Sequence, residues 1–217
     1  MTKNLYLNTG IASLIAFILL VIMHFSWPLK AYSLYDVILG NVNLSDLEKG
    51  DIIQSIGINY ALDTIFIFSW IASWSGLYLH FKSLNVKGIG LCLGLSIAGA
   101  LLDLSENSIS FSLLTGNIKN PENVLLLHSF IRDISFWLPM VASFMLVMMI
   151  PKQSGLSYIA LKFLGIIGVF FAILGMYIQS FSSIPYYWFG LWFLSSSLFL
   201  INNYRKTTIT NKPPKTN

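Results

Sequence analysis

Residues 88–113 read GIGLCLGLSIAGALLDLSENSISFSL, and this stretch decides the class of fold. Its first half is apolar and rich in glycine, and its second half carries Asp103 and Glu106. A helix of about 20 mostly apolar residues crosses the hydrocarbon core of a bilayer. Because backbone polar groups in lipid must be satisfied within the segment, a helix is expected here. The stretch therefore predicts a transmembrane helix that carries acidic side chains.

The composition of the whole chain agrees with a membrane protein. Of its 217 residues, 55% are hydrophobic and 10% are charged, and the mean hydropathy is +0.71. Soluble domains contain about 25% charged residues. This composition excludes an ordinary soluble enzyme and a disordered chain. Cys92 is the single cysteine, so a disulfide scaffold is excluded as well.

Five more stretches resemble the first in length and hydropathy, which predicts an all-α integral membrane protein with a bundle of six transmembrane helices. The predicted spans are residues 10–27, 56–80, 88–113, 124–150, 156–179 and 186–202. Residues 1–203 are expected to form one polytopic membrane domain, and residues 204–217 a disordered basic cytoplasmic tail. Within the outer loop 28–55, Ser45-Asp-Leu-Glu48 is a capping-box pattern that predicts a short surface helix. The first span is interpreted as retained, with a cleaved signal peptide as the alternative.

The charges predict which way the spans face. Six crossings place both termini on one side of the membrane, together with most of the basic residues: Lys3, Lys82, Lys87, Lys152, Lys162, Arg205, Lys206, Lys212 and Lys215. Short loops rich in Lys and Arg stay cytoplasmic. Both termini are therefore expected in the cytoplasm and the protein in the cell membrane. All nine acidic residues lie on or near the opposite, outer side.

Ionisable side chains inside spans are costly and mark functional sites by default. Spacings of three, four and seven put the polar residues of the third span on one stripe, and counting helical turns places them at the same depth as polar residues of the second and fourth spans. We therefore predict a polar site in the outer leaflet. Its expected cation- or proton-binding residues are Asp63, Asp103, Glu106, Asn107, Arg132 and Asp133.

The charges within this band do not balance. Arg132 is the single permanent cation, whereas four carboxylates lie there. Because arginine stays protonated, one carboxylate is expected to pair with it. The remaining acids must take up protons, bind a cation or be balanced by a histidine. The structural alternative is one Arg132–Asp103 salt bridge that joins the third and fourth spans.

Three functions fit this pattern. The first is a metal-assisted membrane hydrolase acting on lipid, with a divalent metal ion held by His24, His128 and Asp103. Its catalytic groups would be Glu106, Asp103 and His128. The second is a small proton- or cation-coupled carrier, and the third is a non-catalytic sensor or assembly protein. The expected partners are the bilayer and a lipid or ion ligand, and the sequence leaves the oligomeric state open. Nucleic acid is not expected, because the basic residues follow the topology.

Small and aromatic residues predict how the helices pack. Gly90, Gly94 and Ala98 are four residues apart, which favours close packing within the bundle. Gly165, Gly168 and Gly175 predict the same for the fifth span. Aromatic residues at the ends of spans are typical of an interfacial belt, and they are Trp27, Tyr186, Tyr187 and Trp188.

Overall fold

The computed structural model describes residues 3–26, 46–116, 121–151, 155–177 and 184–210, and the side chains of most of these. All regular secondary structure in these ranges is helical, as predicted. The helices are α1 (Lys3–Ser26), α3 (Asp46–Ser83), α4 (Ile89–Leu114), α5 (Pro121–Met149), α6 (Leu156–Tyr177) and α7 (Ile184–Thr210).

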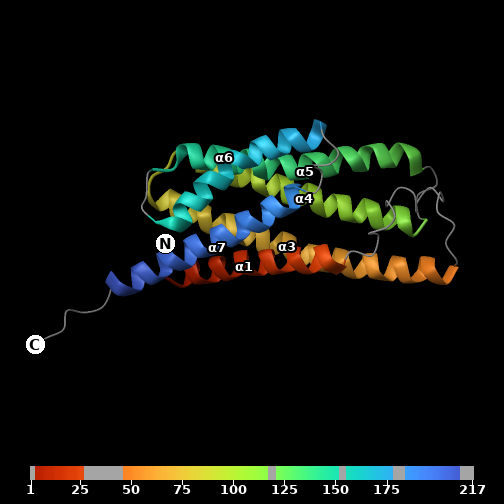
Figure 1. The fold of residues 1–217 in the computed structure, drawn as a ribbon, viewed down its shortest axis with the longest axis horizontal. Coiled ribbons are helices and arrows are strands. Elements are labelled where there is room, and N and C mark those ends of the chain that lie inside the picture. The colour runs from red at the N-terminus through yellow and green to blue at the C-terminus, as the bar shows by residue number, and fades with distance from the viewer. Residues whose placement is uncertain (1–2, 27–45, 117–120, 152–154, 178–183, 211–217) are drawn as a thin grey trace, which may run out of the picture.

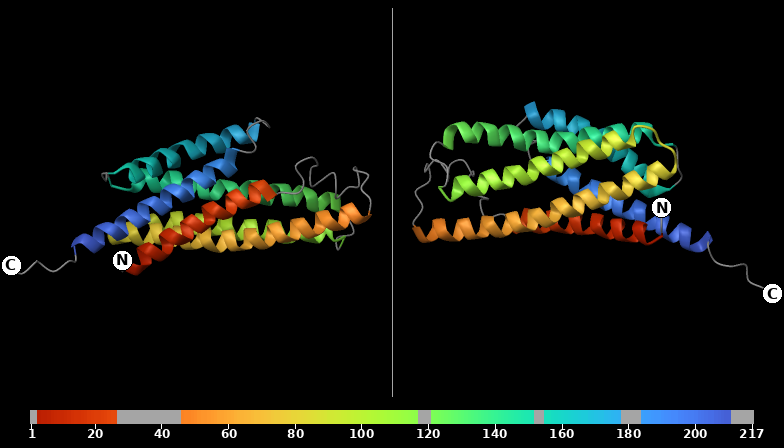
Figure 2. Two further views of the ribbon diagram at one scale, coloured as in Figure 1. Left: turned by 60° about the horizontal axis from the view of Figure 1, so that its bottom comes forward. Right: turned by 180° about the vertical axis from the view of Figure 1, so that it is seen from behind.

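The helices form a ring that follows the order of the chain. Each helix packs against the next one, α7 returns to pack extensively against α1, and α3 also contacts α7 across the ring (Figure 1). Both ends of the described chain lie at one end of the bundle, which we call the terminal end. At the other end α3 and α5 begin and α4 ends, and we call it the acidic end. Here α3, α4 and α5 extend beyond α1, α6 and α7 (Figure 2).

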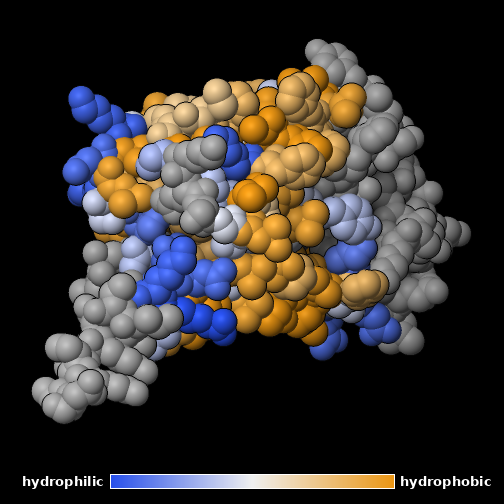
Figure 3. Space-filling view, turned by 60° about the vertical axis from the view of Figure 1, so that its left-hand side comes forward, coloured by the Kyte–Doolittle hydropathy of each residue, from blue (hydrophilic) through white to orange (hydrophobic). Residues whose placement is uncertain are grey.

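The outer surface of the bundle is apolar. Phe68, Phe130 and Met148 are between 63% and 65% exposed, and many other large hydrophobic side chains are also exposed. Figure 3 shows this surface as an apolar belt flanked by hydrophilic residues. Such an extended apolar surface is foreign to a soluble monomer. It indicates a multi-pass helical membrane protein.

Among the described residues, four stretches of helix are long and apolar enough to cross a membrane. They are Asn4–Ser26, Gly50–Ser83, Ile89–Leu114 and Asn123–Met149. Helix α6 is apolar over most of its 22 residues, Leu156–Tyr177. In α7, three serines and two asparagines interrupt the apolar residues. These two helices cover most of the residues of the fifth and sixth predicted spans, and six crossings stay a prediction.

Two predicted boundaries are wrong. The expected short surface helix is not separate, because α3 begins at Asp46 and continues without a break for 38 residues. At 1.5 Å per residue this helix is about 57 Å long, so it extends well beyond a hydrocarbon core of about 30 Å. The tail predicted to start at residue 204 begins inside α7, which extends to Thr210. Residues 27–45 of the outer loop and residues 211–217 lie outside the described residues.

Aromatic side chains fill the contact between α3 and α7. The ring centroids of Trp70 and Phe189 are 5.1 Å apart, and those of Phe66 and Phe193 are 5.5 Å apart. Trp188, predicted for the interfacial belt, is only 1% exposed. Its indole packs against Gly168 of α6, and its N–H donates to the Leu164 carbonyl of the same helix at 2.8 Å. Tyr187 is 56% exposed, and the side chains of Trp27 and Tyr186 lie outside the described residues.

The close helix contacts use different glycines from those predicted in α4. Gly90 and Gly94 are exposed, and a Cβ atom on either would meet no heavy atom within 4 Å. The contact with α5 lies instead at Gly99, where a Cβ atom would come within 2.9 Å of the Ser135 carbonyl oxygen. Pro139 of α5 has no N–H to bond that carbonyl, and Gly99 lets the α4 backbone approach it. The predicted close packing at Gly165 and Gly168 is confirmed, because a Cβ atom on either would meet neighbouring atoms at similarly short distances. The surroundings of Gly175 lie outside the described residues.

Candidate functional site

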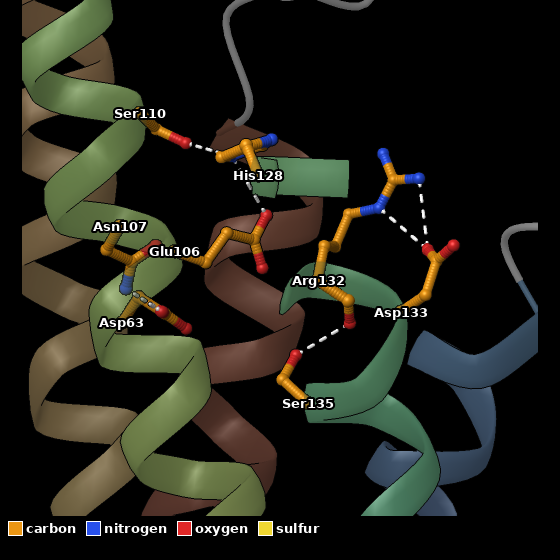
Figure 4. A network of polar contacts seen from close by, with 8 residues as sticks. All are labelled: Asp63, Glu106, Asn107, Ser110, His128, Arg132, Asp133 and Ser135. Carbon is orange, nitrogen blue, oxygen red and sulfur yellow. Dashed lines mark hydrogen bonds and ion pairs between the residues drawn. The ribbon is translucent and has the colours of Figure 1, made fainter. Parts of the chain in front are cut away.

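Three helices bring the predicted polar side chains together at the acidic end (Figure 4). The middle helix is α4, which packs between α3 and α5. Its polar residues are three, four and seven positions apart and so lie on one stripe, and this stripe contacts both neighbouring helices. The stripe consists of Asp103, Glu106, Asn107 and Ser110.

A contact between Glu106 and His128 joins α4 to α5. The distance from Glu106 Oε1 to His128 Nε2 is 3.5 Å, and the two side chains are 16% and 2% exposed. Ser110 Oγ lies 2.5 Å from the same nitrogen. In a hydrolytic triad, the acid and the nucleophile occupy opposite nitrogens of the imidazole. Because the carboxylate and the hydroxyl here share Nε2, the arrangement is suited to holding a proton rather than to activating a nucleophile.

A second contact joins α4 to α3. The side-chain amide of Asn107 donates a hydrogen bond to Asp63 Oδ2. Both side chains are half-buried. One turn before Asp63, Tyr60 reaches Ser110. Ser110 therefore links Tyr60 of α3 with His128 of α5.

Asp103 is the most deeply buried acid of the stripe. Its exposed fraction is 9%, and it lies one turn of α4 before Glu106 and Asn107. Among the described residues, no ion pair joins Asp103 to a basic side chain. The Arg132–Asp103 bridge that we considered as the structural alternative is therefore not formed.

Arg132 instead forms an ion pair with the next residue in the chain. Its guanidinium donates two hydrogen bonds to Asp133 Oδ1, at 3.2 and 3.1 Å. The side chains are 38% and 60% exposed. In Figure 4, Arg132 points away from Glu106 and Asp63 toward Asp133. The charge of Arg132 thus lies at the rim of the site.

The predicted metal ligands do not meet. His24 is exposed at the end of α1, where its Nε2 lies 3.4 Å from the hydroxyl oxygen of Tyr187. It belongs to the packing of α1 against α7, whereas His128 and Asp103 lie on α5 and α4. In the described part of the chain, no group of three or more His, Cys, Asp or Glu side chains is placed to hold a metal ion. The ligand set His24, His128 and Asp103 is therefore not assembled.

Two further residues have roles that the sequence analysis did not assign. Tyr60 belongs to the site, and its position three residues before Asp63 was the signal that the two share a helix face. Asn59, in contrast, is 3% exposed and serves the packing of α3 against α1. Its side chain bonds the Ser55 carbonyl at 3.0 Å and accepts a hydrogen bond from Ser26 at 3.0 Å.

Comparison with known protein families, with characterised sequences and with solved structures finds no match to this chain. The function must therefore be argued from the geometry of the site.

Proposed function

We propose that this chain is a multi-pass membrane protein whose acidic end takes up and releases protons. The observation that carries the proposal is the shared contact of Glu106 and Ser110 with His128 Nε2. It places two titratable side chains from different helices against each other in a largely buried position. The permanent cation nearest to them, Arg132, is paired with Asp133 at the rim.

The contact can hold a proton in more than one place without leaving a polar atom unpaired. A proton on Glu106 can be donated to a neutral imidazole, and a protonated imidazole can donate to an ionised Glu106. The hydroxyl of Ser110 adapts to either state, because it can donate or accept a hydrogen bond. Buried polar groups are costly when they lose their partners. A site that keeps its partners in both states is suited to reversible proton binding.

The other carboxylates support the same proposal. Asp63 accepts a hydrogen bond from Asn107, and Asp103 is buried one turn away without a basic partner among the described residues. A carboxylate in an apolar setting is most stable when it is paired with a cation or neutral. Proton uptake would supply this neutralisation for both carboxylates.

The location of the protein is part of the proposal. Exposed basic residues lie at the terminal end, and they include Lys82, Lys87, Arg205 and Lys206. The positive-inside rule then places this end in the cytoplasm and the acidic end on the outer side of the cell membrane. In this orientation the site would respond to the external pH. It would either couple proton entry to the movement of a solute or act as a sensor.

Difference infrared spectroscopy on the protein in lipid nanodiscs tests the proposal. We expect the C=O stretching band of a protonated carboxyl group to rise and fall as the pH is stepped. Glu106→Gln should remove part of this band, whereas Asp51→Asn, a change at an exposed position of α3, should leave it intact. Wild-type and Glu106→Gln spectra that superimpose at every pH would refute proton binding by Glu106.

A flux measurement then separates transport from sensing. The protein is placed in vesicles containing a pH-sensitive dye, and an external acid pulse is applied. Faster acidification with wild type than with Glu106→Gln supports coupled proton entry. A titrating band without flux supports a sensor.

A further inference from the structure

A second group of polar atoms lies buried in the contact between α3 and α7. Within the described residues, five buried side-chain nitrogen or oxygen atoms have no hydrogen-bond partner. Four of them belong to these two helices, and they are Trp74 Nε1, His80 Nε2, Trp192 Nε1 and Ser196 Oγ. All four side chains are at most 5% exposed.

These atoms follow one another along the contact of the two helices. The indole rings of Trp74 and Trp192 are stacked, with centroids 5.6 Å apart and planes inclined by 24°. Ser196 is one helical turn beyond Trp192 on the same face of α7. The ring of His80 packs against Phe199 at 5.0 Å. Its Nδ1 lies 2.7 Å from the hydroxyl oxygen of Tyr6, which leaves Nε2 without a partner.

Two other tryptophans on the same helices give an internal comparison. Trp70 is one turn before Trp74, and Trp188 is one turn before Trp192. Both are 1% exposed. The indole N–H of Trp70 donates to Ser96 at 2.7 Å, and that of Trp188 donates to the Leu164 carbonyl at 2.8 Å. Each helix therefore carries one indole that has an acceptor from the protein and one that has none.

This group is separate from the acidic site. Trp74 lies 11 residues after Asp63 on α3, which corresponds to about 16 Å along the helix. The aromatic side chains of Phe66, Trp70 and Phe193 lie between them, in mutual ring contact. The inference below rests on burial and hydrogen bonding and is independent of the proposed function.

The chemistry of the four groups defines what they can bind. An indole N–H can only donate, so the ligand must accept hydrogen bonds. The rings are stacked and almost fully buried, so the ligand must be small. No Lys or Arg is among the buried side chains of the described residues, so an anion would lie unpaired in an apolar interior. The ligand must therefore be a small neutral molecule that can both accept and donate hydrogen bonds.

We propose that ordered water molecules bind between α3 and α7, at Trp74, Trp192, Ser196 and His80. Water accepts from the two indoles and can donate to Ser196 Oγ or His80 Nε2. Buried waters in proteins make about three hydrogen bonds to polar groups that otherwise lack partners. The half of the bundle toward the terminal end thus contains a hydrated polar site. The described residues of this half include no Asp or Glu.

Nitrogen-15 NMR of the indole groups tests this proposal on the full chain in nanodiscs of deuterated lipid. Single Trp→Phe variants assign the signals. We expect magnetisation transfer from water to the indole protons of Trp74 and Trp192. The equally buried Trp70 and Trp188 should show none.

Three outcomes would overturn the proposal. One is the absence of transfer at Trp74 and Trp192, with the chemical shift of a non-bonded indole. Another is equal transfer at all four buried indoles, which would indicate general penetration of water. The third, seen in a parallel sample prepared with protonated lipid, is transfer from the lipid in place of water, which would make a lipid group the ligand. Ser196→Ala provides a second test, because it should weaken the water signal at Trp192 and leave the Trp188 signal unchanged.

Discussion

The pairing of Glu106 with His128 can be tested by a double-mutant cycle. His128→Leu removes the imidazole, which is 2% exposed, and leaves Ser110 and Glu106 without their shared partner. An orphaned buried polar group costs about 1–3 kcal/mol. We expect a loss near the middle of this range, because Glu106 is 16% exposed and can still reach some solvent.

The second arm of the cycle is Glu106→Gln. The glutamine amide can still donate to His128 Nε2, so we expect a smaller loss, of about 0.5–1.5 kcal/mol. The double variant should lose less than the sum of the two single changes. The expected coupling is about 1 kcal/mol, within the range that measured contacts between neighbouring residues show.

The assay is reversible unfolding in mixed micelles, followed by tryptophan fluorescence. It should be repeated over about pH 5 to 8, where an imidazole ordinarily titrates. The proposed sharing of a proton between Glu106 and His128 predicts that the coupling changes with pH. Strictly additive losses, or a coupling that is the same at every pH, would refute the reasoning for a shared proton.

Three further predictions concern packing and pairing within the bundle, and all use the same unfolding assay. Gly99→Ala should cost about 1–3 kcal/mol, because its Cβ atom would press on a backbone carbonyl 2.9 Å away. Gly94→Ala is the matched control and should change the stability by less than about 0.5 kcal/mol; equal losses would contradict the packing of α4 described above. Asn107→Leu should cost about 1–3 kcal/mol, since Asp63 loses its donor, and no loss would show that the contact is not formed. Arg132→Gln should cost less than about 1 kcal/mol, as expected for an exposed ion pair, and a larger loss would mean that the guanidinium faces the interior.

Much of the site could be predicted because helix periodicity and depth are properties of the sequence. The stripe on α4 and the common level of Asp63, Glu106 and His128 follow from counting residues along three predicted spans. Periodicity does not fix how each helix is rotated about its axis. The side chains of Arg132 and Asp133 leave α5 in directions about 100° apart. The rotation of α5 about its axis places both at the rim, where they form an ion pair.

The remaining errors share a similar cause. Gly90 and Gly94 have the spacing of a packing motif, but spacing does not say which side of α4 meets another helix. Helix α4 packs closely against α5 at Gly99, where it meets Pro139, a residue far away in the sequence. His24 has the right depth for the site, but α1 packs on α3 and α7, and this neighbour relation depends on how the ring closes.

The closure of the ring by α7 bears on how the protein is made. The side chains that bury Trp70 and Trp74 include Phe189 and Trp192 of the last helix. During synthesis α1 and α3 therefore enter the membrane before their partner exists, and the faces that α7 covers meet lipid until α7 has been made. A chain stopped before residue 184 would keep these faces uncovered, and we expect quality-control proteases to remove it.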